Sequence, residues 1–215
     1  MVFKGIFENR PMKFTEHKNP TYPPRTEHNA KSADLTVAFA EKFDTSGEAL
    51  THSKAGDRYV GIALQKTPRN AAIDLFRACK KHNAKVLNVA GNGIYTLKEY
   101  DWTQEKLNLW AFQVMKFVHD HHPFKKVISG GQTGVDWAGG VAAEVLGIPG
   151  EMTFPKGYLQ RTLTEFKLTQ TKDDVERKFN DDVRVLRSML VELGIEVPEP
   201  AEKKPEPPED LFELC

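Results

Sequence analysis

Short, continuous apolar runs alternate along this chain with segments that place apolar residues at helical spacing, and this alternation limits the fold more than any other feature. Apolar runs without polar alternation are typical of strands buried on both faces of a parallel sheet. The expected strands cover residues 35–39, 59–64, 85–90, 126–129 and 151–154. The alternation predicts an α/β fold with a doubly wound, mostly parallel sheet and helices on both faces.

Amphipathic segments lie between these strands and carry residues that favour helix ends. Pro68 suits the first turn of a helix, and Asp101 with Gln104 forms an expected capping pair. Thr171 and Asp174 open the last segment. The expected helices cover residues 68–82, 103–119, 132–146 and 171–193.

Composition divides the 215 residues into an arm, a domain and a tail. Residues 1–24 contain prolines and few periodic apolar positions, so we expect an arm that lies over the domain. Residues 25–195 carry the strands and helices. Residues 196–215 form an acidic, proline-rich tail, for which we expect disorder. The apolar end of this tail could anchor a partner or a second copy of the chain. The sequence therefore allows a homo-oligomer.

The charges balance, since Lys and Arg total 30 and Asp and Glu total 30. A general nucleic-acid binder is usually basic, so this class is not expected. Apolar runs are too short for a membrane span, and the first residues do not match a secretion signal. With two cysteines, a disulfide framework is not expected. We therefore expect a soluble, cytoplasmic protein without a membrane partner.

The strongest candidate for a ligand site is the glycine-rich turn between the expected strand at 126–129 and the next helix. Glycines allow close approach to the backbone, and free N–H groups at a helix start favour an anion. The Thr133 hydroxyl could add a hydrogen bond, and Asp136 could cap the helix or bind a sugar hydroxyl. A tight turn without a ligand is the alternative, which the position at a strand's carboxyl end disfavours. The candidate residues are Gly130, Gly131, Gln132, Thr133, Gly134 and Asp136.

A second turn of this kind follows the expected strand at 85–90 and contains Gly91, Asn92 and Gly93. Asn92 tolerates a left-handed backbone and could donate to a phosphate. Because carboxyl ends of parallel strands meet at one edge of a sheet, we expect the two turns to border a single cleft.

Other segments contribute further candidates. Arg25 offers a planar fork for phosphate or carboxylate, and a surface ion pair with Glu27 or another acid is the alternative. Residues 45–51 are expected to form a small polar loop whose hydroxyl and N–H groups could face an anion. Lys156 follows a strand end and is expected to converge with Arg25 on the glycine-rich turn. The candidates from these segments are Arg25, Glu27, Asn29, Ser46, Gly47, Thr51 and Lys156.

No residue stands out as a nucleophile, and no metal site is expected. His119, His121 and His122 do not have a standard zinc spacing, and histidines near a helix C-terminus gain from the helix dipole without a metal. We therefore assign no catalytic residue. Arg25 is expected to be an exposed residue of the pocket, so its removal should change thermal stability little.

Residues 129–136, followed by 147–149 and 155–157, resemble the first half of the molybdenum-carrier family, which belongs to the SLOG group of Rossmann-like domains. Residues 25–29, 32–34, 47–51 and 86–91 resemble its second half. Because the second half comes first here, the resemblance implies a circular permutation through the helix at 103–119. The family's Gly-Gly-Thr loop reads Ser46-Gly47-Glu48 in this chain, and the glutamate motif of the related lonely-guy phosphoribohydrolases does not match.

The resemblance implies a Gly-rich cleft that binds a phosphate-bearing, nucleotide-derived or pterin-type small molecule, molybdenum cofactor included. The chain would then be a carrier, a sensor or a sequestering protein. One alternative is a nucleotide or N-glycosidic hydrolase of the lonely-guy type, with Asp136 or Glu27 as base. The other is an interaction protein that acts through its acidic tail.

Overall fold

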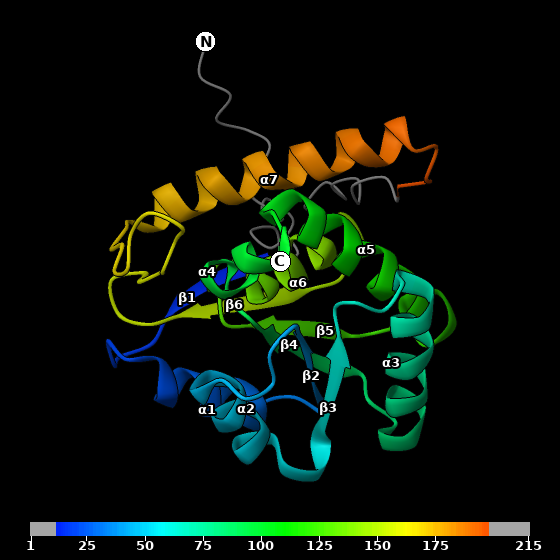
Figure 1. Ribbon diagram of the computed structural model, residues 1–215, viewed down its shortest axis with the longest axis horizontal. Helices are drawn as coiled ribbons and strands as arrows, with labels where there is room; N and C mark the ends of the chain where they lie inside the picture. Colours follow the sequence, from blue (N-terminus) through cyan, green and yellow to red (C-terminus); the bar gives the residue numbers. More distant parts are fainter. Residues whose placement is uncertain (1–11, 198–215) are drawn as a thin grey trace, which may run out of the picture.

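The computed structural model describes residues 12–197, and within this range six parallel strands form one sheet in the order β1-β6-β5-β4-β2-β3 (Figure 1). Each pair of neighbours is parallel, so all strand carboxyl ends lie at the same edge. The expected α/β class with a parallel sheet is confirmed. The strands are β1 Met12–Glu16, β2 Leu35–Ala40, β3 Tyr59–Ala63, β4 Val86–Gly91, β5 Lys126–Ser129 and β6 Gly150–Phe154.

Helices cover both faces of the sheet, as the alternation predicts (Figure 1). Helices α1 and α2 pack together on one face, whereas α3, α5 and α6 cover the other and α7 packs outside them against α5 and α6. The α-helices are α1 Tyr22–Lys31, α2 Ser46–Ala55, α3 Pro68–His82, α4 Ile94–Leu97, α5 Gln104–His121, α6 Val135–Val145 and α7 Lys172–Glu192. Short 3-10 turns occupy η1 Gly56–Arg58 and η2 Lys98–Tyr100.

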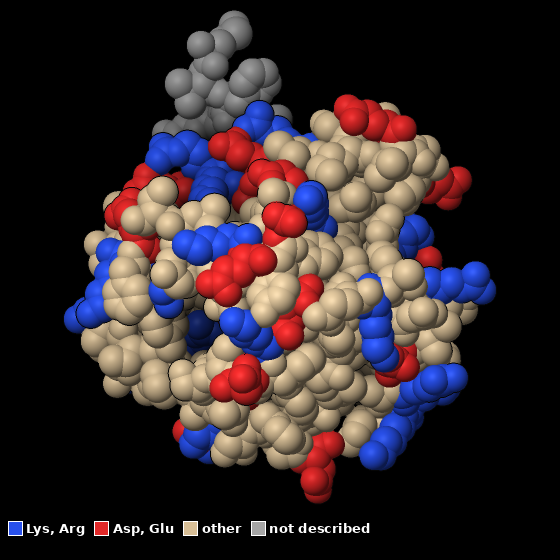
Figure 2. All heavy atoms as spheres, in the orientation of Figure 1, with Lys and Arg blue, Asp and Glu red and all other residues tan. Residues whose placement is uncertain are grey.

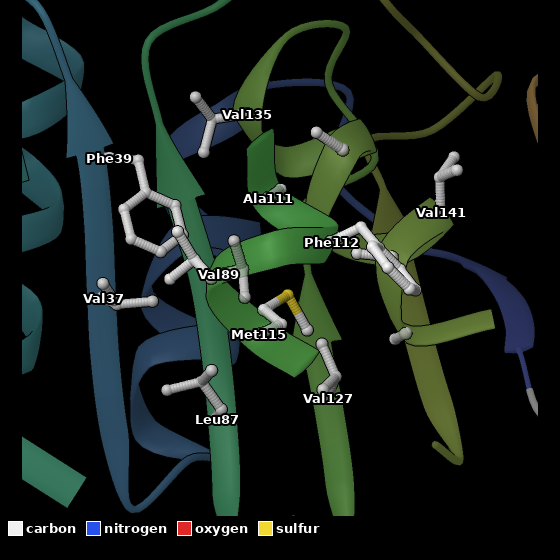
Figure 3. Close-up of a cluster of buried hydrophobic side chains, with 14 of the residues drawn as sticks. Val37, Phe39, Leu87, Val89, Ala111, Phe112, Met115, Val127, Val135 and Val141 are labelled. Atoms are coloured by element: carbon white, nitrogen blue, oxygen red, sulfur yellow. The ribbon is translucent and has the colours of Figure 1, made fainter. Parts of the chain in front are cut away.

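The main hydrophobic core fills the space between the sheet and helices α5 and α6. Figure 3 shows side chains of β2 and β4 meeting side chains of these two helices. This packing buries the apolar surface that drives folding and fixes the strand ends next to the start of α6. Members of this cluster include Val37, Phe39, Leu87, Val89, Ala111, Phe112, Met115, Val127, Val135 and Val141.

The helix ends agree with the sequence at one expected capping site and differ at another. Thr171 and Asp174 form a capping box at the start of α7. At α5, however, Thr103 is the N-cap, because its hydroxyl accepts a hydrogen bond from the Lys106 N–H at 3.3 Å. Asp101 lies outside the helix with a positive φ of 58°, so the expected pair of Asp101 and Gln104 is wrong.

The expected arm at residues 1–24 is corrected by the structure. Residues Met12–Glu16 form β1, an edge strand, which pairs with β6 in the register Met12 to Gly150. Its buried Phe14 packs edge-on against Phe179 of α7, with ring centroids 5.0 Å apart. Too few apolar positions mark such a short edge strand in the sequence. Residues 1–11 of the expected arm and residues 198–215 of the tail expected at 196–215 lie outside the described residues, so the correction concerns residues 12–24 alone.

Two helices replace segments that were expected to be irregular. Helix α1 contains the Arg25–Asn29 segment, and α2 begins at Ser46 within the expected polar loop. Their buried residues include Arg25, Asn29, Glu48 and Thr51, so neither helix has an ordinary apolar stripe. These polar faces point to a site instead of a core.

In the described part of the chain, every helix is too short or too polar to cross a bilayer.

Candidate functional site

A cavity of about 610 Å³ lies at the carboxyl edge of the sheet. Helices α1 and α2 form one wall, the end of β4 and the turn after it form the floor, and Tyr95 and Arg161 stand at the opposite side. The volume is within the range of small-molecule sites. Candidates from the sequence that line it are Arg25, Asn29, Ser46, Gly47, Thr51, Gly91, Asn92, Gly93, Gln132 and Asp136.

The two glycine-rich turns lie side by side, as expected for one cleft. Gly93 and Gly134 form an antiparallel bridge. The Ile94 N–H donates to the Thr133 carbonyl at 3.1 Å, and the Val135 N–H donates to the Asn92 carbonyl at 3.2 Å. The turns therefore brace each other and hold the strand ends of β4 and β5 in fixed positions.

The turn at 130–134 uses much of its donor capacity within the protein. The N–H groups of Gly131, Thr133 and Gly134 donate to the Ser129 hydroxyl, the Gln132 side chain and the Gln104 side chain, respectively. The Thr133 hydroxyl donates to the Arg161 carbonyl. Within this turn, Gln132 lines the cavity, whereas Gly130, Gly131, Thr133 and Gly134 do not. Most of the candidate residues in this turn therefore lie outside the cavity lining.

Arg25 and Asp136 form a buried ion pair at the cavity floor. Arg25 Nη1 lies 3.0 Å from Asp136 Oδ2, and each side chain is 8% exposed. Burial raises the pKa of Asp136, while Arg25 and the backbone of Gln132 and Gly91 oppose that shift. Asp136 lies in the first turn of α6, where a negative charge is favoured by the helix dipole.

The Arg25–Asn29 segment is divided by the period of its helix, because residues four apart share a face. Arg25 and Asn29 turn inward, and Asn29 Nδ2 donates to the Ser129 carbonyl at 2.9 Å. Glu27 instead pairs with Lys31 and Lys54 at 2.6 and 2.9 Å, outside the cavity lining. Hydrogen bonds from these two lysines lower the pKa of Glu27 to about 2. Glu27 is thus no candidate for a base in this cavity.

Lys156 does not meet Arg25 in the structure. It is absent from the cavity lining, and its backbone N–H donates to the Asn19 carbonyl at 3.1 Å. Asn92 lines the cavity, but its side chain accepts from the Glu41 and Lys42 N–H groups and donates to the Lys42 carbonyl, each at 2.9 Å. Its polar atoms therefore hold the loop after β2.

Arg161 lines the cavity, in which Lys156 was expected. Its Cζ lies 3.6 Å from the Tyr95 ring centroid and 4.7 Å from that of Phe166, so aromatic rings orient the guanidinium. Its backbone N–H donates to Gln132 Oε1 at 2.8 Å. Residue 161 lies between β6 and α7, in a segment without a periodic pattern, and no sequence signal marks it.

Glu48 is the second acidic side chain in the cavity and was not a sequence candidate. It is 3% exposed, and the Tyr59 hydroxyl donates to its Oε2 at 3.5 Å. Burial, and then the charge of Asp136, raise the pKa of Glu48 to about 7. Thr51 near it is satisfied, because its hydroxyl donates to the Gly47 carbonyl at 2.9 Å.

Unpartnered polar atoms concentrate in this cavity. Among the described residues, every buried side-chain nitrogen or oxygen without a hydrogen-bond partner belongs to a residue that lines it. They include Arg25 Nε, Asn29 Oδ1, Asn88 Oδ1 and Arg161 Nε. Such atoms cost free energy when left unpaired, so their clustering indicates a site that is completed by a ligand or by water.

Comparisons of this chain with protein-family models, with curated proteins and with solved structures found no match. The resemblance to the molybdenum-carrier family therefore stays a prediction from the motifs.

Proposed function

We propose that the protein binds a phosphate-bearing, nucleotide-derived small molecule in this cavity, as a carrier, sensor or sequestering protein. The observation that supports this most is the cluster of unpartnered donors and acceptors on the cavity wall. Donors and acceptors are both present, so a ligand that carries both an anion and hydrogen-bonding groups would satisfy them.

In this proposal Arg161 contacts the phosphate. Its guanidinium is held against Tyr95 and Phe166, and its Nε is buried without a partner. An arginine that is already oriented loses less side-chain entropy when it binds an anion. Asn29 Oδ1 and Asn88 Oδ1 would accept hydrogen bonds from the sugar or the ring, and Tyr22 offers flat apolar surface.

Molybdenum cofactor remains one member of this ligand class. The lining suits its organic phosphate and ring, through Arg161 and Tyr22. The lining contains no cysteine, and the structure, as far as it is described, has no cluster of three His, Cys, Asp or Glu side chains able to hold a metal ion. The residues thus support contacts to the phosphate and ring, with no protein ligand assigned to a metal.

A general nucleic-acid surface is not part of this proposal. Figure 2 shows that Lys and Arg are interspersed with Asp and Glu on the face in view, without a broad basic field. Nucleic-acid binding through phosphates usually requires such a field. The ligand class proposed here is therefore a small molecule.

The test is incubation of the pure protein with a panel of nucleotides, followed by mass spectrometry of the bound and the released species. We expect at least one nucleoside phosphate to remain bound, and removal of its phosphate to abolish retention. Retention of no panel member, or equal retention of nucleosides and nucleotides, would contradict the proposal.

A second candidate function, hydrolysis of the N-glycosidic bond of a nucleotide, is favoured by Glu48. A buried carboxyl whose pKa is about 7 can hold a proton near neutral pH and donate it to a leaving base. The same panel decides, because hydrolysis releases free base and sugar phosphate in amounts that exceed the protein. The loss of this release in Glu48→Gln, with binding retained, would support the enzyme.

A further inference from the structure

We propose that Glu48 couples ligand binding to the uptake of a proton, and so determines how much negative charge the cavity accepts. This coupling rests on the proposed function, since it requires an anionic ligand, and it adds a proton as the second species that the site binds.

Of the two acids that line the cavity, one has a cation beside it. Asp136 is paired with Arg25 at 3.0 Å, so this pair carries no net charge. Glu48 forms no ion pair with any described residue, and its polar neighbour is the neutral Tyr59 hydroxyl at 3.5 Å. An isolated carboxylate is costly to bury, so Glu48 needs either a proton or a cationic ligand group.

The groups closest to Glu48 offer little positive charge that could stabilise its ionised form in place of that proton. Asp136 of α6 disfavours its ionisation, and Tyr59 of β3 stacks on His52 of α2 with centroids 4.3 Å apart. The remaining titratable or charged groups that line the cavity come from α1, α4 and the segment before α7. They are Tyr22, Arg25, Tyr95 and Arg161.

An anionic ligand adds negative charge to the space that Glu48 shares with Asp136. Coulomb repulsion is strong in a partly enclosed cavity, so the ligand favours the protonated form of Glu48. By linkage, a form that binds a proton more tightly in the complex draws a proton from solution on binding. Between the pKa of Glu48 in the free protein and its higher pKa in the complex, affinity then falls by about tenfold for each pH unit.

A cationic ligand group would give the opposite sign. It would pair with ionised Glu48, release a proton and bind more tightly as the pH rises. The direction of proton transfer therefore reports which chemistry Glu48 meets, independently of the affinity itself.

The experiment is calorimetric titration with the nucleoside 5′-monophosphate that binds best in the panel. It is done at pH 7.5 in phosphate-free buffers with different ionisation enthalpies, and the affinity is measured again at pH 8.5. In this range a phosphate monoester, whose second pKa is about 6, is already a dianion, so its own titration adds little. We expect uptake of a fraction of one proton and a loss of affinity approaching tenfold between the two pH values.

The matched variants are Glu48→Gln and Glu27→Gln. Both replace a glutamate by its amide, but Glu27 lies outside the cavity lining and pairs with lysines. Glu48→Gln is expected to bind without proton uptake and with equal affinity at both pH values, whereas Glu27→Gln behaves as the wild type. If Glu48→Gln does not fold, the proton count of the wild type still decides.

The outcomes separate the two proposals. Binding of the nucleotide with no proton uptake, or with proton release, overturns the role of Glu48 and leaves the proposed function standing. Uptake that persists unchanged in Glu48→Gln overturns it as well. A wild-type protein that binds no nucleotide overturns both.

Discussion

Gly130 lies directly against Arg25: a Cβ atom at position 130 would be 1.4 Å from Arg25 Nη1 and 2.2 Å from Asp136 Oδ2. The absence of a side chain at this position therefore makes room for the buried ion pair. In the sequence the same glycine indicates a ligand that approaches the backbone. In the structure the group that approaches is the protein's own guanidinium.

Gly130→Ala is expected to lower the free energy of unfolding by about 1–3 kcal/mol, because the added methyl group displaces a buried pair. Chemical denaturation measures this change. Gly47→Ala is the control, since Gly47 lines the cavity and a Cβ there meets no atom within 4 Å. Equal stability of the two variants would show that Arg25 moves aside without cost.

Arg25→Ala is expected to destabilise the fold by about 3–5 kcal/mol, because it leaves the Asp136 carboxylate buried without its partner. The sequence had suggested an exposed arginine whose loss changes stability little, and the 8% exposure of its side chain contradicts this. Adding Asp136→Asn to Arg25→Ala should recover part of the loss. A double variant that is less stable than Arg25→Ala would show that the unpaired Asp136 carboxylate does not cause the loss of stability.

Stability should also depend on pH through Glu48. Its pKa is raised from 4.5 to about 7, so the folded protein binds the proton more tightly than the unfolded chain. The contribution is complete below pH 4.5 and is lost as the pH rises to 7, by about 3 kcal/mol over that interval. The free energies of unfolding of the wild type and of Glu48→Gln are measured by denaturation across this pH range. The difference between them should then give the pH dependence that Glu48 contributes. A constant difference would mean that Glu48 is ionised in the folded state near its ordinary pKa.

Strands β2 to β6 and helices α3, α5, α6 and α7 could be predicted because their apolar residues report burial directly, whereas the short edge strand β1 was missed. Helices α1 and α2 were missed for the opposite reason. Their inner faces carry Arg25, Asn29, Glu48 and Thr51, and a polar inner face looks like a loop in a single sequence. The prolines at the start of α1 also suggested an irregular arm, although proline is well tolerated in the first helical turn.

The position of the cavity could be predicted, since two glycine-rich turns follow neighbouring parallel strands. The residues inside it were harder to identify. Whether N–H groups of the turn are free depends on Gln104, which is distant in sequence and accepts from Gly134. Arg161 reaches the cavity only through the path of the segment after β6, which no local pattern reports.

At Gly131, packing and backbone conformation in the structure determine what a substitution does. A Cβ there would lie 2.5 Å from the Phe154 ring, and the φ of 68° disfavours other residues. Gly131→Val should therefore unfold the protein regardless of any ligand, as a thermal melt would show. A well-folded Gly131→Val protein that fails to bind would restore the turn as a ligand contact.

The central claim, a phosphate site in this cavity, is tested most directly by calorimetric titration of a nucleoside 5′-monophosphate into wild type, Arg161→Ala and Lys156→Ala. A charge-assisted contact contributes about 1.5–3 kcal/mol, so Arg161→Ala should bind roughly ten- to a hundred-fold more weakly. Lys156→Ala removes a cation outside the cavity lining and should bind as the wild type does. Equal affinity of all three proteins, or no binding by the wild type, would contradict the account.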